Sequence, residues 1–268
     1  MNKRVKRFVG KALRFVLRGV CLPMIGEAGS PFWYRPSEYP RLLFGHRWFE
    51  ASKRKEWAAL LQPGEVILDI GANIGLTAHR FYSLLKGRCT IWCFEPVPRN
   101  LQLLRKNCHC IRDRTQIMGV ALGAENREVT FRDNLEHGAL SRLASLDATK
   151  PPNPMMWDSA KEIVVQQITL DSFMKSHPEL SPTFLKIDVE GAGGQVVAGG
   201  ADLFKRFRPF VECSMHSKEE QQTVCALLAE AGYHGLHLVG GAYERIELHK
   251  ASIFAHADDK RLGLPRSV

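Results

Sequence analysis

The chain has 268 residues, of which 45% are apolar and 24% charged, which is enough for one well-buried domain and too little for two catalytic domains. Its net charge of +9 is concentrated at the N-terminus, because residues 1–18 carry seven lysines and arginines and no acidic residue. The rest of the chain is nearly neutral and lacks the broad basic face of a nucleic-acid-binding protein, so we expect no nucleic-acid partner.

The seven cysteines are an odd number in a long chain, which is typical of free thiols in a reducing compartment and predicts a cytoplasmic location. No run of about 18 apolar residues could span a bilayer, and the N-terminus lacks the apolar core and cleavage site of a secretory signal. Four cysteines lie close in sequence, but their "CHC" spacing is not that of a zinc finger or ribbon, and we predict buried thiols there (Cys89, Cys93, Cys108 and Cys110).

Residues 1–20 form an amphipathic pattern when they are wound as a helix at about 100° per residue. Lysines and arginines then lie on one side, and apolar residues such as Phe8 and Phe15 lie on the other. This pattern is typical of a helix at a membrane interface, and we infer peripheral attachment to an anionic membrane at its inner face. A surface helix that packs its apolar side on the same chain would show the same pattern, so both interpretations remain open.

Residues 21–49 are rich in proline and aromatic residues, which predicts an irregular arm that either wraps the core or lines an acceptor pocket. A helix is predicted over residues 47–61 and is closed by Gln62-Pro63-Gly64. We therefore expect residues 21–62 to form an accessory segment before a main domain at 63–268.

Strand and helix patterns alternate from residue 65 onward, which predicts an α/β fold with a mostly parallel sheet and helices on both faces. Residues 133–161 form a long segment without such a pattern, which indicates a lid, a specificity insert or disorder. Strands are predicted at 65–70, 89–95, 115–122, 128–133, 162–170, 183–189, 208–214, 234–240 and 245–256, and helices at 74–86, 98–108, 193–207 and 217–232.

The stretch "DIGANIG" follows the first of these strands and predicts a ligand-binding turn. Gly71 and Gly75 allow a tight bend and a close approach of the ligand to the backbone. The middle glycine of the dinucleotide motif G-x-G-x-x-G is missing, and no lysine follows as in a Walker loop. The turn therefore favours a nucleoside-like ligand whose tail is an amino acid.

Glu95 lies twenty residues after Gly75, at the end of the second strand. A carboxylate at this place can accept hydrogen bonds from both hydroxyls of a ribose. The alternative is a tight turn and an exposed glutamate that have no common ligand.

The words "VILDIGANIG", "CFEPVPRNLQLLRKN", "ITLDSF" and "FLKIDVEGAGGQVVAGG…RPFVEC" resemble the FkbM family of S-adenosylmethionine-dependent methyltransferases, in register over about residues 64–214. The resemblance implies a Rossmann-like class I methyltransferase sheet of seven strands with its last strand antiparallel, S-adenosylmethionine as cofactor, and O-methylation of sugar or polyketide hydroxyls. The implied cofactor contacts are the turn for the methionine part, Glu95 for the ribose and two residues near the adenine (Asp69, Gly71, Asn73, Gly75; Glu95; Val120, Ala121).

The motif "KIDVEG" at the end of the fourth core strand supplies the candidates for catalysis. Asp188 and Glu190 lie on one face of an extended strand, where two carboxylates can raise each other's pKa or hold a divalent cation. Glu212, on the next strand, could join them, and His216 lies just beyond. We expect Asp188 to act as base or acceptor anchor, although it could instead cap the following helix.

One position departs from the family pattern, because Gly193 stands where the family usually has an acidic residue. The departure weakens any role that needs a third carboxylate there, and we predict no metal site. It also leaves reduced or altered activity open.

The sequence thus favours an O-methyltransferase that acts on a hydroxyl of a glycan, a glycolipid or a related natural product. A membrane-associated binding protein on a methyltransferase fold, without catalysis, is the alternative from another class. An RNA methyltransferase is disfavoured by the nearly neutral body of the chain.

Overall fold

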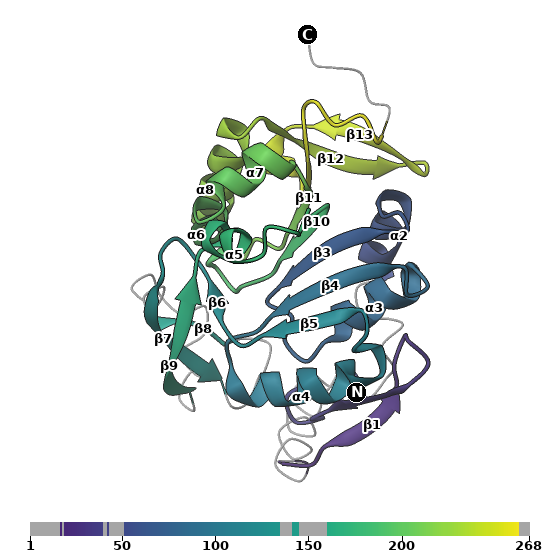
Figure 1. The fold of residues 1–268 in the computed structure, drawn as a ribbon, viewed down its shortest axis with the longest axis vertical. Helices are drawn as coiled ribbons and strands as arrows, with labels where there is room; N and C mark the ends of the chain where they lie inside the picture. The colour runs from purple at the N-terminus through teal and green to yellow at the C-terminus, as the bar shows by residue number, and fades with distance from the viewer. Residues whose placement is uncertain are drawn as a thin grey trace, which may run out of the picture.

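The computed structural model of the chain describes residues 17, 19–39, 42, 51–134, 141–144 and 160–262. An eight-stranded sheet runs through the middle of this part, in the order β13-β12-β14-β11-β10-β3-β4-β5 (Figure 1). Its strands are β3 (Glu65–Ile70), β4 (Cys89–Phe94), β5 (Thr115–Met118), β10 (Phe184–Ile187), β11 (Phe210–Cys213), β12 (Tyr233–Val239), β13 (Ala242–Ile246) and β14 (Ile253–His256).

The five strands from β11 to β5 are parallel, and β14 lies antiparallel between β11 and β12. This arrangement confirms the expected α/β fold with a mostly parallel sheet and an antiparallel last strand. The main sheet exceeds the expected seven strands by one, because the hairpin partner β13 extends the edge beyond β12.

Helices cover both faces of the sheet because its buried strands carry apolar residues on both sides. In β3, Ile67 faces one helix layer and Leu68 faces the other, and both are fully buried. Figure 1 shows one layer to each side of the sheet. The first consists of α2 (Ala51–Leu60), α3 (Leu76–Leu84) and α4 (Pro98–Cys108), and the second of α5 (Leu170–Ser176), α6 (Gly193–Ala198), α7 (Ala201–Phe207) and α8 (Lys218–Glu230).

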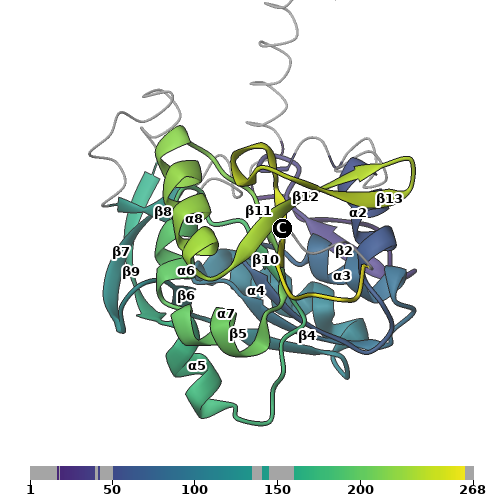
Figure 2. The same cartoon turned by 90° about the horizontal axis from the view of Figure 1, so that it is seen from above.

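A second sheet lies beside the first, in the order β6-β9-β7-β8, and the sequence did not predict it (Figures 1 and 2). It consists of β6 (Ala121–Leu122), β7 (Arg127–Asn134), β8 (Arg142–Leu143) and β9 (Ala160–Ile168). The single strand expected at 115–122 is wrong, because the chain leaves the main sheet after β5 and joins the small sheet as β6. Gly119 lies at this break, where an added Cβ would come within 2.9 Å of Leu101.

Two other expected elements are broken in the structure. The helix expected at 193–207 ends at Ala198 and restarts at Ala201, with the helix-weakening pair Gly199-Gly200 at the break. Gly199 packs closely on the backbone of Gly123, where an added Cβ would lie 2.0 Å from the carbonyl oxygen. The strand expected at 245–256 ends with β13, and a short 3₁₀ helix at Leu248–Lys250 separates it from β14.

The arm expected to be irregular contains a hairpin of β1 (Leu22–Ile25) and β2 (Pro31–Tyr34). Fully buried Phe32 and buried Tyr34 pack with Leu103 of α4, so the hairpin covers that helix. Trp57 of α2 is fully buried in the same core as the strands. The basic segment 1–20 lies almost entirely outside the described residues.

The segment 133–161 begins at the end of β7, contains β8 and ends at the start of β9, so it is not a loop throughout. Residues 135–140 and 145–159 of it lie outside the described part. Among the helices that the structure describes, none is long and apolar enough to cross a bilayer.

Three charged side chains lie in register across the parallel strands, on the face that carries α2. Lys186 of β10 is paired in the sheet with Asp69 of β3 on one side and Glu212 of β11 on the other. The Lys186 Nζ atom lies 3.3 Å from an Asp69 carboxylate oxygen and donates a 3.0 Å hydrogen bond to the carbonyl of Gly71. The lysine therefore neutralises a fully buried carboxylate and holds the turn that follows β3.

Replacing Lys186 with methionine keeps an unbranched side chain and removes its charge. We expect the free energy of unfolding to fall by about 3 kcal/mol, because buried Asp69 loses its cationic neighbour. Equilibrium unfolding in urea measures the change. The control Lys175→Met alters an exposed lysine of α5 and should stay within about 0.5 kcal/mol of wild type. Equal stability of the two variants would contradict this role of Lys186.

Candidate active site

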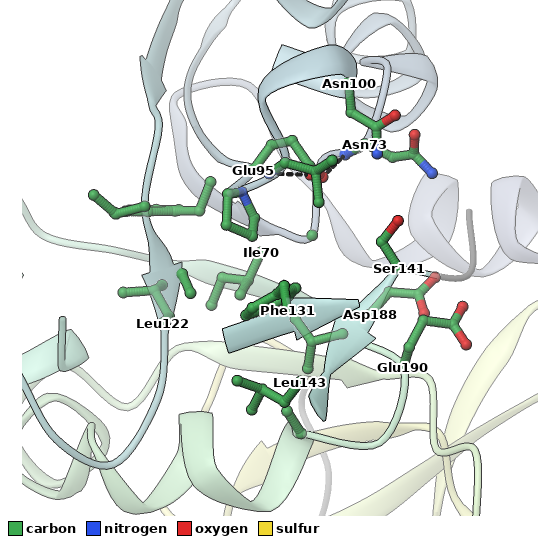
Figure 3. A pocket seen from close by; sticks show the side chains of 18 residues that line it. Ile70, Asn73, Glu95, Asn100, Leu122, Phe131, Ser141, Leu143, Asp188 and Glu190 are labelled. Atoms are coloured by element: carbon green, nitrogen blue, oxygen red, sulfur yellow. Dashed lines mark hydrogen bonds between the residues drawn. The ribbon is translucent and has the colours of Figure 1, made fainter. Parts of the chain in front are cut away.

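A cavity lies where the carboxyl ends of β3, β4 and β10 meet the small sheet (Figure 3). It encloses about 580 Å³, open solvent at its mouth included. Its polar wall comes from the turns after these strands, and its apolar wall comes from the link between β5 and β6 and from the small sheet. The residues that carry the argument below are Gly71, Asn73, Glu95, Val120, Ala121, Asp188 and Glu190.

The turn after β3 can form only with glycine at position 71. Gly71 has φ 78°, and an added Cβ would lie 2.0 Å from the carbonyl oxygen of Asp188. The turn after β3 and the loop after β10 are therefore in direct backbone contact. The side chain of Asn73, at φ 51°, accepts a hydrogen bond from the hydroxyl of Tyr39, which connects the N-terminal arm to the turn.

Glu95 faces this turn from the end of β4, as Figure 3 shows. Its carboxylate accepts 2.9 Å hydrogen bonds from the backbone N–H groups of Asn73 and Val97, and the residue is only 5% exposed. Burial raises the pKa of Glu95 to about 7, although the hydrogen bonds from Val97, Asn73 and Asn100 act in the opposite direction. The site therefore holds a carboxylate at the edge of a cavity that contains the glycine turn.

Seven of the residues predicted from the sequence line this cavity, and three lie elsewhere. Asp69 is fully buried beside Lys186 below the turn. Gly75 precedes α3 in a left-handed conformation, and an added Cβ would lie 2.9 Å from Leu104 of α4. Glu212 is fully buried and forms a 2.7 Å ion pair with Lys53 of α2, in a neighbouring cavity.

His216 connects the two candidate carboxylates, and the sequence predictions did not assign it a role. Its Nε2 atom lies 2.9 Å from an Asp188 oxygen, and its Nδ1 atom lies 3.5 Å from Glu190. The available signal was its position, since it follows β11 at the same sheet edge where Asp188 follows β10.

The ion pair between Asp188 and His216 determines the protonation states of both residues. The hydrogen bond with Asp188 raises the pKa of His216 to about 9 against the effect of burial, and the charges of Glu190 and Glu220 act in the same direction. Burial alone would raise the pKa of Asp188, but Lys186 and His216 lower it to about 2. At neutral pH the cluster therefore contains an imidazolium and an ionised Asp188.

Gly193, where an acidic residue was expected, lies against the carboxylate of Glu220 from α8. Glu220 accepts a 2.8 Å hydrogen bond from the Gly193 N–H and a 2.6 Å hydrogen bond from the His216 N–H. An added Cβ at position 193 would come within 2.8 Å of the Glu220 carboxylate. A carboxylate from another helix thus occupies the space beside Gly193 and fixes the backbone of His216.

Asp188, Glu190 and His216 are also the group among the described residues whose ligand atoms, all within 4.8 Å of one another, could hold a metal ion. The imidazole lies between the two carboxylates, so ion pairing by itself accounts for their closeness. The cysteines form no such group in the described part, and all seven are free thiols. Cys89, Cys93 and Cys108 are buried in the core as predicted, but the prediction is wrong for Cys110, which is exposed beyond the end of α4.

Comparison with known proteins identifies the family. The model of the methyltransferase FkbM domain matches residues 69–234. The chain is 31% identical over 154 residues to 2-O-methyltransferase NoeI of Sinorhizobium fredii (strain NBRC 101917 / NGR234), and 30% identical over 161 residues to 31-O-demethyl-FK506 methyltransferase FkbM of Streptomyces tacrolimicus. These matches cover 56% and 53% of this chain and 63% and 62% of the relatives, so the chain spans less than two thirds of either relative.

A similar solved structure is that of methyltransferase FkbM from Methylobacillus flagellatus KT, with 18% identity and a TM-score of 0.49 over 73% of this chain and 44% of that one. The family match covers more than half of the chain and includes the glycine turn, Glu95 and the Asp188–His216 pair. The chain therefore belongs to the FkbM family of methyltransferases, whose cofactor is S-adenosylmethionine.

Proposed function

We propose that the protein is an S-adenosylmethionine-dependent O-methyltransferase whose acceptor is a hydroxyl of a glycan, a glycolipid or a related natural product. The observation that carries the proposal is Glu95, which faces the Gly71–Asn73 turn across one cavity. Family membership and two relatives whose names state O-methylation support the reaction type.

The cavity suits the cofactor in three respects. Glu95 offers carboxylate oxygens at the place of a ribose diol, and the turn at Gly71 brings backbone groups close to an amino-acid tail. Val120, Ala121 and Leu122 supply an apolar wall for the adenine ring. Asp69 and Gly75 support the turn from behind, so we assign them to its shape and not to direct contact.

S-adenosylmethionine supplies an activated methyl group, and the chief task of the protein is then to align the acceptor oxygen with it. Alignment of this kind lowers the barrier by about 7–11 kcal/mol, whereas a base adds about 10²–10⁴-fold. The acceptor oxygen would form its new bond to the methyl carbon as the carbon–sulfur bond of the cofactor breaks and the sulfur leaves as a thioether, and the hydroxyl proton would pass to a base. We assign this proton to His216 in its neutral form and the orientation of the imidazole to Asp188. Asp188, with its low pKa, is a poor base.

The non-catalytic alternative rested on the missing acidic residue at position 193. Glu220 places a carboxylate beside that position and holds His216, which favours a functional site.

Peripheral attachment of residues 1–20 to an anionic membrane remains part of the proposal, and it would bring the site close to a lipid-linked acceptor. Comparing the glycans and lipids of cells with and without the gene by mass spectrometry tests the acceptor, since one methyl group should be lost.

We expect Glu95→Gln to weaken S-adenosylmethionine binding at least about tenfold, because the amide offers one acceptor oxygen instead of a carboxylate. In the wild type, binding should also weaken as the pH falls from 8 to 6, because Glu95 becomes protonated near pH 7. Calorimetric titration at both pH values measures this. Glu128→Gln, an exposed glutamate of β7, is the matched control. Unchanged affinity in Glu95→Gln would refute the ribose role.

We expect the rate of methyl transfer to rise with pH with a midpoint near pH 9, where half of the His216 imidazolium has lost its proton, and to level off above it. The carboxylates of Asp188, Glu190 and Glu220 lie close to this ring, and each raises the pKa of His216. Asp188→Asn removes the largest of these effects, so it should move the midpoint to lower pH and reduce turnover at least about 10²-fold while cofactor affinity is kept. Release of S-adenosylhomocysteine reports the rate. A flat profile from pH 6 to 10 would exclude His216 as the base.

A further inference from the structure

A second cavity adjoins the cofactor cavity, on the side of β11. It is formed by the end of β11 and the link to α8, the start of α8, Lys53 of α2 and Ser252 before β14. The side chains that carry the argument are Lys53, Glu212, Ser214, His216, Lys218 and Gln221.

The two cavities meet at the Asp188–His216 pair. Asp188 lines the cofactor cavity, and His216, 2.9 Å away, lines the second cavity. A group bound in the second cavity therefore lies next to the imidazole that we assign as base, at the place where this cavity meets the cofactor cavity. Glu190 lies 3.5 Å from the Nδ1 atom of the same imidazole, and Glu220 accepts a hydrogen bond from the backbone N–H of His216.

The charges in the second cavity are arranged in pairs. Lys53 forms a 2.7 Å ion pair with the fully buried Glu212 and donates a 2.8 Å hydrogen bond to the hydroxyl of Ser214. His216 is paired with Asp188, and the exposed Lys218 adds one cation. The cavity thus presents donors and acceptors side by side, and Lys53 and His216 each have a carboxylate next to them.

This mixture matches a particular class of acceptor. Each hydroxyl of a sugar both donates and accepts a hydrogen bond, so neighbouring hydroxyls need neighbouring acceptors and donors. All lining residues except Cys213 and Met215 carry a polar side chain, whereas a pocket for an apolar macrocycle would be chiefly apolar.

We propose that this second cavity is the acceptor subsite and that it binds a polyhydroxylated, sugar-like group through Lys53, Glu212 and Ser214. The inference rests on the proposed O-methyltransferase function and names the substrate class and the residues that select it. A free glycan and the head group of a glycolipid share this chemistry.

Binding of neutral methyl glycosides, and of octyl glycosides of the same sugars, to the full chain saturated with S-adenosylhomocysteine tests the proposal by saturation-transfer NMR. We expect wild type to bind at least one sugar, and Lys53→Met and Ser214→Ala each to weaken that binding at least about tenfold. Lys55→Met changes an exposed lysine of the same helix and should bind as wild type does. Ser214→Ala leaves the Lys53–Glu212 ion pair in place, so it remains informative if Lys53→Met fails to fold.

Binding of a methyl glycoside would support a free glycan, and binding of octyl glycosides alone, if Lys53→Met or Ser214→Ala weakens it, would support a lipid-linked sugar. The proposal is overturned if no glycoside binds, or if both cavity variants bind as tightly as Lys55→Met. Failure of the proposed function would look different, since wild type would then not bind S-adenosylmethionine. Cofactor affinity should stay within about twofold of wild type in the two cavity variants.

Discussion

The contact between Lys186 and the turn at Gly71 is the constraint on which the site depends. Lys186 lies between Asp69 and Glu212 in neighbouring strands, with its ammonium group bonded to the carbonyl of Gly71. A buried lysine is stable here because a fully buried carboxylate lies 3.3 Å away. The same ammonium lies 3.9 Å from Asp188 and helps to keep that carboxyl ionised. One side chain thus connects the sheet, the turn at Gly71 and the loop after β10.

The loops that follow β10 and β11 carry Asp188 and His216, the pair that we propose for proton transfer. Asp188 orients His216, and Glu220 of α8 holds the backbone of His216 together with the N–H of Gly193. The imidazole therefore keeps a fixed position between the two cavities. Its acidic neighbours also stabilise the imidazolium, so the contacts that fix the ring also raise the pKa of His216.

The sequence predicted the parallel core because buried strands read as continuous apolar runs. It placed Glu95 beside the glycine turn because the ends of neighbouring parallel strands meet at one edge of the sheet. It did not predict the small sheet, since the apolar pattern of 115–122 continues through the break at Gly119. The partnership of Gly193 with Glu220 could not be predicted either, because it depends on how α8 packs, 27 residues further along. Asp69 and Gly75 were expected to contact the cofactor, but they lie behind the turn and do not line the cavity.

Calorimetric titration of S-adenosylmethionine into wild type, Gly71→Ala and Gly29→Ala tests the central claim most directly. Both glycines have nearly the same positive φ, 78° and 76°, but only at Gly71 would an added Cβ meet another atom, the carbonyl oxygen of Asp188. The account predicts binding to wild type and to Gly29→Ala, and none to a folded Gly71→Ala. Absence of binding to wild type, or undiminished binding to Gly71→Ala, would contradict it.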